Sequence, residues 1–338
     1  MKTRLLSITL VAILLFSMVS CDFLKNKNEA PETETPTINI HTLNGTTGFG
    51  MAKLMNDAKI GATTEKYNFS VQTDASNVTA ALLNGSADIA ALPTNAAANV
   101  YNKSEGGVVV LAVNTLGCLY LLTNQNETIN SFEDLRGKTV YVPAQNPTFI
   151  FTYLCQQNGL EVGKDITVNS STYAQPAALK DAVAAGLVDI AVLPEPMVTI
   201  AINSAKSANN GTTITNAMDL TAEWNKVSVE GSLVQGCVVV RRAFLEQYPE
   251  AVENFLKEYK ASIEFLSTDI DSASQMIVDN GIFSNTGVAK KALPGCNVCF
   301  LDGAAMKSAM ETYLGVLFGI APASVGGKLP ADDFYYAR

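Results

Sequence analysis

The sequence predicts an α/β protein with two lobes, each built on a mostly parallel sheet flanked by helices. The main observation is a nine-residue pattern, G-x-x-D-I-A-x-L-P, which occurs at residues 85–93 and again at residues 186–194. Each copy follows a helical run of small residues, and its first glycine suits a left-handed helix end. The length of 338 residues also favours two domains over one.

Each copy of the repeat predicts a turn, a strand and the start of a helix. Its apolar run is too short for a helix and unbroken enough for a strand that is buried on both faces. The proline then ends the strand and opens a helix, where its missing N–H costs little. Ligands bind at the carboxyl ends of strands in open α/β sheets, so the repeats predict two binding edges that can face each other. The alternative is two ordinary units of one large sheet.

Composition and charge exclude several function classes. The chain is 48% hydrophobic and 16% charged, as expected for a globular protein with a sizeable core. Its formal net charge is -9 at pH 7, and removal of a leader with Lys2 and Arg4 leaves about -11. An acidic chain without basic runs is not expected to bind nucleic acid. Because His41 is the only histidine, neither a Ser/His/Asp triad nor a histidine-rich zinc site can form.

The first 36 residues predict export and anchoring at a bacterial membrane. Residues 1–20 have a charged start and an apolar run that is too short for a comfortable membrane span, which is typical of a signal peptide. Residues 18–21, M-V-S-C, resemble a lipobox, so Cys21 is expected to be lipidated and to become the mature N-terminus. Residues 21–36 lack periodicity and predict a flexible tether to an extracytoplasmic body. An ordinary signal peptide with an incidental cysteine is the alternative.

The body begins with a predicted strand at 38–43 and a glycine-rich turn at 44–50. Such a turn before a helix leaves backbone N–H groups free to hold a ligand, although a plain strand–helix turn is the alternative. It lacks the Lys-Ser/Thr of a nucleotide-binding loop. Further strands are expected at 69–73, 108–113, 119–123, 139–143, 166–169 and 233–240, and helices dominate after residue 249.

Two crossings of the chain divide the predicted lobes. The strand pattern breaks at 114–117 and restarts at residue 118, and the strand at 233–240 would carry the chain back to the first lobe. The first lobe is therefore expected at 37–116 and 232–338, and the second lobe at 117–231.

Four motifs make the chain similar to type II periplasmic binding proteins, the substrate-binding subunits of ABC importers. Within that fold it resembles the nitrate/sulfonate/taurine and thiamine-pyrimidine-precursor branch. Bacterial lipoproteins of this branch share L-x-G-P-T-G-M-G, matched at 43–50, and D-L-x-G-K-T, matched at 134–139. They also share the repeat at 85–93 and L-P-x-x-x-F-Y-Y, matched at 329–336. Thr46 and Phe49 replace the proline and methionine of the first motif.

The resemblance implies a lipid-anchored, monomeric solute-binding protein that passes a small molecule to an ABC permease. It implies neither catalysis nor a cofactor nor a metal. A pyrimidine-synthase-like enzyme of the same fold is an alternative, because such enzymes carry a cysteine-rich iron motif that Cys296-x-x-Cys299 superficially resembles. That pair can also be a local disulfide or two buried thiols. A ligand-sensing lobe for a membrane receptor is the other alternative.

Polar residues at the predicted helix starts are the candidate ligand-binding residues. They are mostly neutral, with Phe149 and Tyr173 nearby, and no lysine or arginine lies in these turns. A planar heterocycle with an amino group, such as a vitamin precursor, therefore suits them, with Glu195 as the charged anchor. Helix N-termini can also hold an anion unaided. The set is Asn44, Thr46, Thr47, Phe49, Thr94, Asn95, Thr115, Gln145, Asn146, Thr148, Glu195 and Gln235.

Cys21→Ser is expected to release the protein from membranes into the soluble exported fraction, because the thiol that would carry the lipid is gone. Membrane fractionation followed by immunoblotting measures this. Ser20→Ala, which keeps a small residue before the cysteine, is the control and should stay bound. Undiminished membrane association of the Cys21→Ser protein would contradict the lipid anchor.

Overall fold

The computed structural model describes residues 36–209 and 211–337. The predicted signal peptide, Cys21 and all of the tether except its last residue lie outside the described residues. In the described part, no helix combines the length and the apolar character needed to cross a membrane.

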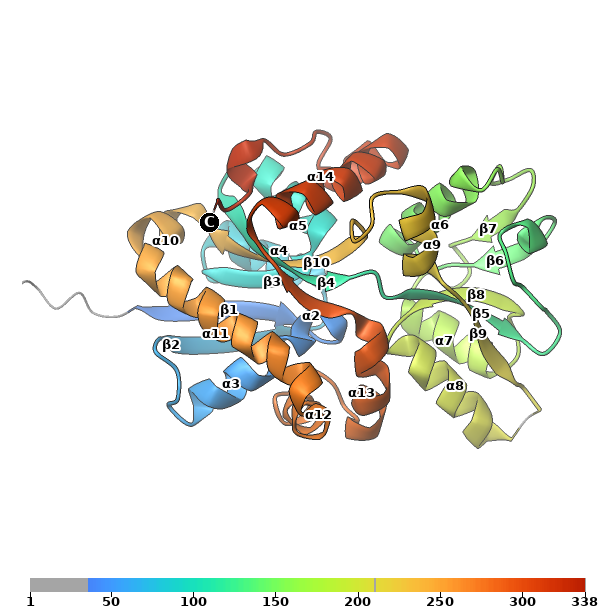
Figure 1. The fold of residues 1–338 in the computed structure, drawn as a ribbon, viewed down its shortest axis with the longest axis horizontal. Coiled ribbons are helices and arrows are strands. Elements are labelled where there is room, and N and C mark those ends of the chain that lie inside the picture. The colour runs from blue at the N-terminus through green and yellow to red at the C-terminus, as the bar shows by residue number, and fades with distance from the viewer. Residues whose placement is uncertain (1–35, 210, 338) are drawn as a thin grey trace, which may run out of the picture. The chain divides into compact units, whose positions relative to one another are not determined.

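The described residues form two mixed sheets rather than one large sheet, which confirms the predicted α/β class (Figure 1). In the six-stranded sheet the order is β11-β4-β10-β3-β1-β2, and in the five-stranded sheet it is β7-β6-β8-β5-β9. The first contains β1 (Thr37–Leu43), β2 (Lys66–Gln72), β3 (Ile89–Pro93), β4 (Val108–Leu116), β10 (Val234–Arg241) and β11 (Val298–Leu301). The second contains β5 (Leu119–Asn124), β6 (Thr139–Tyr141), β7 (Thr167–Asn169), β8 (Ile190–Pro194) and β9 (Ile214–Asp219).

Helices flank both sheets. Strands β1, β2 and β3 are parallel, as are β6, β7 and β8, whereas β10, β11 and β5 run against their neighbours. With the six-stranded sheet lie α2 (Thr46–Phe49), α3 (Ala52–Lys59), α4 (Ala75–Asn84), α5 (Thr94–Lys103), α10 (Arg242–Gln247), α11 (Pro249–Thr268), α12 (Ile270–Asp279), α13 (Thr286–Ala292) and α14 (Gly303–Ile320), and the short turns η2 (Leu293–Cys296), η3 (Pro322–Val325) and η4 (Asp332–Phe334). With the five-stranded sheet lie η1 (Glu133–Leu135), α6 (Asn146–Gln157), α7 (Pro176–Ala184), α8 (Met197–Ala208) and α9 (Leu220–Val227).

The two repeats form equivalent units, as predicted. Gly85 and Gly186 follow α4 and α7 with φ of 80° and 74°, in the left-handed region that favours glycine. Strands β3 and β8 are each buried over their first four residues. Pro93 directly precedes α5. The prediction that Pro194 opens the next helix is wrong, because α8 starts only after Pro196, which occupies its N-cap.

The aspartate of each repeat ties its strand to a neighbouring segment. Asp88 accepts hydrogen bonds at 3.0 Å from the backbone and side-chain nitrogens of Asn39, and its other oxygen lies 2.6 Å from Arg241 Nη2. Asp189 accepts a 2.5 Å hydrogen bond from Asn124 Nδ2. These carboxylates lie at the start of the strands, so they fix the strands from the end opposite the predicted binding edges.

Within the described residues the chain passes between the sheets twice. It leaves through Gly117 and Cys118, between β4 and β5, and returns through residues 228–233 (Figure 1). The prediction of a break at 114–117 is wrong, because β4 continues to Leu116 by pairing with Val234 in β10. Strand β10 returns the chain to the six-stranded sheet, as predicted, and it lies between β3 and β4. The lobe boundaries at 116/117 and 231/232 stay a prediction.

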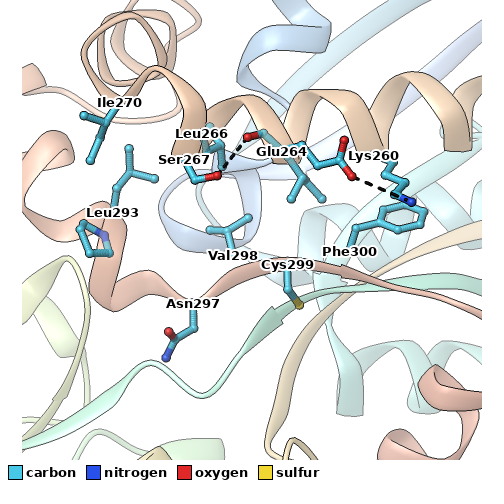
Figure 2. Close-up of a pocket in the computed structure, with 12 residues that line it drawn as sticks. Lys260, Glu264, Leu266, Ser267, Ile270, Leu293, Asn297, Val298, Cys299 and Phe300 are labelled. Atoms are coloured by element: carbon cyan, nitrogen blue, oxygen red, sulfur yellow. Dashed lines mark hydrogen bonds and ion pairs between the residues drawn. The ribbon is translucent and has the colours of Figure 1, made fainter.

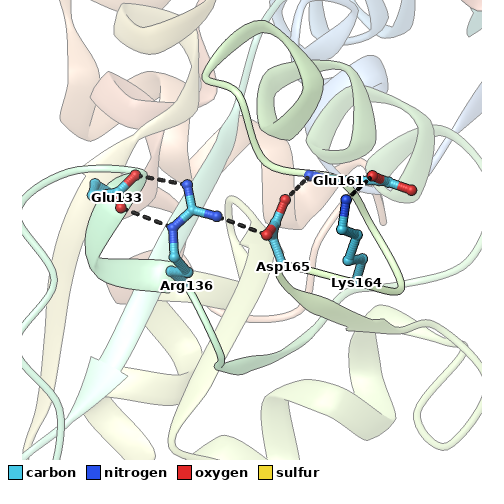
Figure 3. A network of polar contacts seen from close by, with 5 residues as sticks. All are labelled: Glu133, Arg136, Glu161, Lys164 and Asp165. Carbon is cyan, nitrogen blue, oxygen red and sulfur yellow. Dashed lines mark hydrogen bonds and ion pairs between the residues drawn. The ribbon is translucent and has the colours of Figure 1, made fainter.

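An ion-pair network connects two surface loops of the five-stranded sheet (Figure 3). Arg136 contacts Glu133 at 2.8 Å and Asp165 at 2.7 Å, so the turn before β6 is joined to the loop before β7. The pKa of Glu133 is lowered by its hydrogen bond from Arg136. Asp165 also accepts from the Glu161 backbone N–H, which lowers its pKa. Because these groups are exposed, the network orders the loops but contributes little to stability.

Asp88→Ala is expected to lower the free energy of unfolding by about 2–4 kcal/mol, because Arg241 and Asn39 lose their shared buried acceptor. Urea unfolding followed by circular dichroism measures this. The control is Asp181→Ala, which removes a side chain that is 73% exposed and should change stability by less than about 0.5 kcal/mol. Equal effects of the two variants would contradict a structural role for the repeat aspartate.

Candidate functional site

Helix N-termini from the two sheets meet near the ends of β3 and β8. Thr46, the first residue of α2, donates a 2.9 Å hydrogen bond from Oγ1 to the backbone carbonyl of Glu195. Asn146, the first residue of α6, donates a 2.7 Å hydrogen bond from Nδ2 to Oδ1 of Asn95 in α5. We call these four residues the facing edge. Both contacts join an element of the six-stranded sheet to one of the five-stranded sheet, and all four residues are in the predicted set.

Glu195 is a buried carboxylate with a local partner. Its Oε2 accepts from Thr199 N at 3.1 Å, and its Oε1 accepts from Thr199 Oγ1 at 2.9 Å, so it caps the start of α8. The residue is only 9% exposed. Burial raises its pKa, and the hydrogen bonds from Thr199 oppose this rise. The side chain therefore has a structural duty, yet its remaining acceptor sites can receive an N–H group.

Residues 295–297, which were not among the predicted site residues, also contact the facing edge and the residues beside it. Gly295 O, in η2, accepts a 2.9 Å hydrogen bond from Tyr120 Oη, and Cys296 Sγ lies 3.7 Å from Thr46 Oγ1. Asn297 donates to Gly117 O at 2.6 Å, which ties the segment to the crossing between the sheets. The turn signal of Pro294-Gly295 was the available clue.

The cysteines of this segment are free thiols rather than a disulfide. Cys296 is buried and Cys299 is partly buried, and the other described cysteines are also free. Burial raises the pKa of Cys299 to about 12, so that thiol stays protonated at neutral pH. Among residues 36–209 and 211–337, no group of three or more His, Cys, Asp and Glu side chains is placed to hold a metal ion.

Three other predicted site residues support the crossings and the strand ends. Thr94 Oγ1 donates to Val234 O at 2.7 Å, and Gln235 Oε1 accepts from Cys118 N at 2.8 Å. Thr115 Oγ1 donates to Asn114 Oδ1 at 3.1 Å inside β4. The contact of Gln235 links β10 to the crossing at Cys118, whereas those of Thr94 and Thr115 lie within the six-stranded side.

The remaining five predicted residues have other surroundings. Phe49 is fully buried and packs edge-on against Phe283 at 6.0 Å, so it belongs to the core. Thr148 donates to Pro143 O, within its own turn. Asn44 and Gln145 are exposed. Thr47 contributes its backbone carbonyl, which accepts from Asn114 Nδ2 at 3.2 Å.

A separate groove of about 560 Å³ lies between α11 and β11 (Figure 2). Its charged groups, Lys260 and Glu264, lie 3.9 Å apart and face each other. All its lining residues belong to α11, the start of α12, η2 and the segment through β11, so a ligand there would touch only the six-stranded side. None of the predicted site residues lines it, and we therefore place the candidate site at the facing edge.

Comparison with known proteins decides the family. A family profile described as "ABC transporter, phosphonate, periplasmic substrate-binding protein" matches residues 59–280, which is more than half of the chain. The chain belongs to this family. It is thus an extracytoplasmic substrate-binding component of an ABC importer, and the predicted resemblance is confirmed. Members of this family are binding proteins rather than enzymes.

Solved structures agree with this assignment. An ABC transporter protein from Parabacteroides distasonis is 22% identical, with a TM-score of 0.73 over 89% of this substrate-binding protein and 99% of that chain. The periplasmic aliphatic sulphonate-binding protein SsuA from Escherichia coli is 15% identical, with a TM-score of 0.68. That match covers 86% of this chain and 96% of the SsuA chain. The periplasmic nitrate-binding protein NrtA from Synechocystis is 14% identical, with a TM-score of 0.60. That match covers 86% of this chain and 83% of the NrtA chain. These likenesses show the fold. No curated protein matches the sequence.

The buried carboxylate of Glu195 predicts a pH dependence of stability. Its pKa is raised above the ordinary value of 4.5, so just above pH 4.5 the folded state binds more protons than the unfolded state. Stability therefore falls as pH rises from 4.5 through the raised pKa. Glu195→Gln keeps an acceptor for Thr199 but has no proton to lose, so its stability relative to wild type should increase across this range.

Urea unfolding of both proteins between pH 4 and pH 8 measures this difference. Because all other titrating groups are shared, the difference between the two proteins isolates Glu195. A difference that stays constant across the range would contradict a raised pKa.

Proposed function

We propose that this substrate-binding protein captures a small, neutral or amino-bearing solute between two lobes and delivers it to an ABC permease. The lobes are residues 37–116 with 232–338, and residues 117–231. The observation that carries the proposal is the pair of contacts from Thr46 to Glu195 and from Asn95 to Asn146. Each joins polar groups at the helix starts of one sheet to those of the other, where open α/β sheets bind ligands.

The chemistry of the edge favours an amino group over an oxyanion. The solved relatives are named for sulphonate and nitrate, and the family for phosphonate. In this chain the charged residue of the facing edge is Glu195, and none of its four residues is basic. A buried carboxylate repels an anion and attracts an N–H donor. A planar heterocycle with an amino group, such as a vitamin precursor, suits this edge.

Closure of the lobes would couple binding to delivery. Hinge motion needs few connecting segments, and the chain crosses at Gly117–Cys118 and at 228–233 in the described part. A solute that touches both sheets stabilises the closed form by its higher affinity for closed over open. The closed form then distinguishes the loaded protein for the permease.

The proposal includes a lipid on Cys21, a monomeric state and no catalysis. The enzyme alternative needs a histidine beside the solute, and His41 lies inside β1 with its Nδ1 buried and without a hydrogen-bond partner. Burial lowers its pKa. That setting favours a neutral structural side chain over a reacting one. A sensing role differs only in the membrane partner that receives the closed form.

Native mass spectrometry of protein purified without refolding should show a bound solute. Calorimetry with that solute is expected to show a loss of about 1–2 kcal/mol for Asn95→Ala, because Asn146 then loses the side chain that orients its amide. Glu195→Gln should cost about 1.5–3 kcal/mol, because a charged acceptor is lost. His41→Ala is the control and should bind within about threefold of wild type, because a side chain off the site contributes little.

Three results would argue against this function. Stoichiometric iron with a product that depends on His41 would favour the enzyme. Tighter binding of ethanesulfonate or methylphosphonate than of any amino-bearing solute would contradict the proposed solute class. An unchanged radius in small-angle scattering on solute binding would contradict closure.

A further inference from the structure

Three asparagines on one face of α5 hold the C-terminal turn η3. Asn95, Asn99 and Asn102 are spaced so that their side chains lie on the same side of the helix. Their Nδ2 atoms donate to the backbone carbonyls of η3, at 3.3 Å, 3.4 Å and 2.8 Å respectively. The carbonyl that Asn95 contacts is that of Ser324. Only Asn95 of the three also reaches the five-stranded sheet, through Asn146.

The contact with Ser324 sets the direction of the hydrogen bond between Asn95 and Asn146. A backbone carbonyl can only accept, so Asn95 must present its Nδ2 to Ser324 and its Oδ1 to Asn146. Asn146 must then present its Nδ2 to Asn95, which leaves its Oδ1 as the free end of the series. A flip of either side-chain amide would exchange its oxygen and nitrogen, and it would place two acceptors or two donors against each other. The direction of both amides therefore follows from one main-chain oxygen.

The free end of this series is a buried acceptor without a partner. Asn146 Oδ1 is shielded from solvent and accepts no hydrogen bond within the described protein. A buried acceptor is unfavourable until a donor reaches it, so solute or water is needed there. It lies in a residue of the facing edge, at the start of α6.

We propose that Asn146 Oδ1 is the specificity-determining acceptor for an N–H group of the solute. Asn95 is a positioning residue, which fixes the direction of the Asn146 amide through Ser324. This inference rests on the proposed function and narrows its solute class to molecules with an N–H donor. Nitrate and alkanesulfonates without an amino group offer only acceptors at neutral pH, so they would place an acceptor against an acceptor.

Three matched probes test the donor requirement by calorimetry. 4-Aminopyrimidine and 4-(methylamino)pyrimidine carry an N–H, and 4-(dimethylamino)pyrimidine has similar acceptors without one. Wild type is expected to prefer both N–H probes over the dimethyl probe by roughly tenfold or more, because one buried hydrogen bond is lost. Equal binding of the two N–H probes shows that added bulk is not the cause.

Two variants and a matched control assign the roles. Asn146→Leu should reduce the preference to within about twofold, because the acceptor is gone. Asn95→Leu should reduce it to a similar extent, because Asn146 can then turn its amide and offer a donor instead. Asn99→Leu removes an equivalent contact to η3 without touching Asn146, and it should keep the wild-type preference. Circular dichroism confirms that each variant is folded.

The outcomes separate this inference from the proposed function. If wild type binds the dimethyl probe as tightly as the two N–H probes, the inference is overturned but the proposed function is not. The same holds if Asn99→Leu loses the preference for N–H probes as much as Asn95→Leu does. Identification of a co-purified solute without any N–H group would do the same. A wild-type protein that carries no solute and binds none of the probes would overturn the proposed function, and the inference with it.

Discussion

The contacts across the facing edge depend on where β3 and β8 end. Each repeat turns on a left-handed glycine, Gly85 or Gly186, and then sends a buried strand through its sheet. The aspartates at the start of these strands fix them from the far end. Because both strands run toward the other sheet, the polar residues that follow them meet there. The site is thus a consequence of strand direction, and few of its contacts are local in sequence.

Much of the fold could be predicted because its signals are local. A short apolar run bounded by glycine and proline defines β3 and β8 without reference to other segments. The same reasoning failed at Pro194, where a second proline two residues later moved the helix start. It also ended β4 too early, because polar Asn114 and Thr115 suggested a turn, whereas pairing with β10 extends the strand. Propensity could not reveal that pairing.

Part of the candidate site could be anticipated from the sequence, because some of its residues follow predicted strands. Asn95, Asn146, Thr46 and Glu195 stand at predicted helix starts, so their direction followed from topology. Ser324 and Gly295 come from distant segments and contribute backbone carbonyls, for which side-chain chemistry gives no signal. Phe49 also stood in a predicted turn, yet it packs in the core, because one turn of helix carries its ring inward. Departures from the resembled motif do not mark ligand contacts by themselves.

A crystal structure of the protein with its co-purified solute tests the central claim most directly. The account predicts density at the facing edge, with residues of both sheets in contact and an N–H of the solute within hydrogen-bond distance of Asn146 Oδ1. Density confined to the groove between α11 and β11, or a solute that touches one sheet only, would contradict the account.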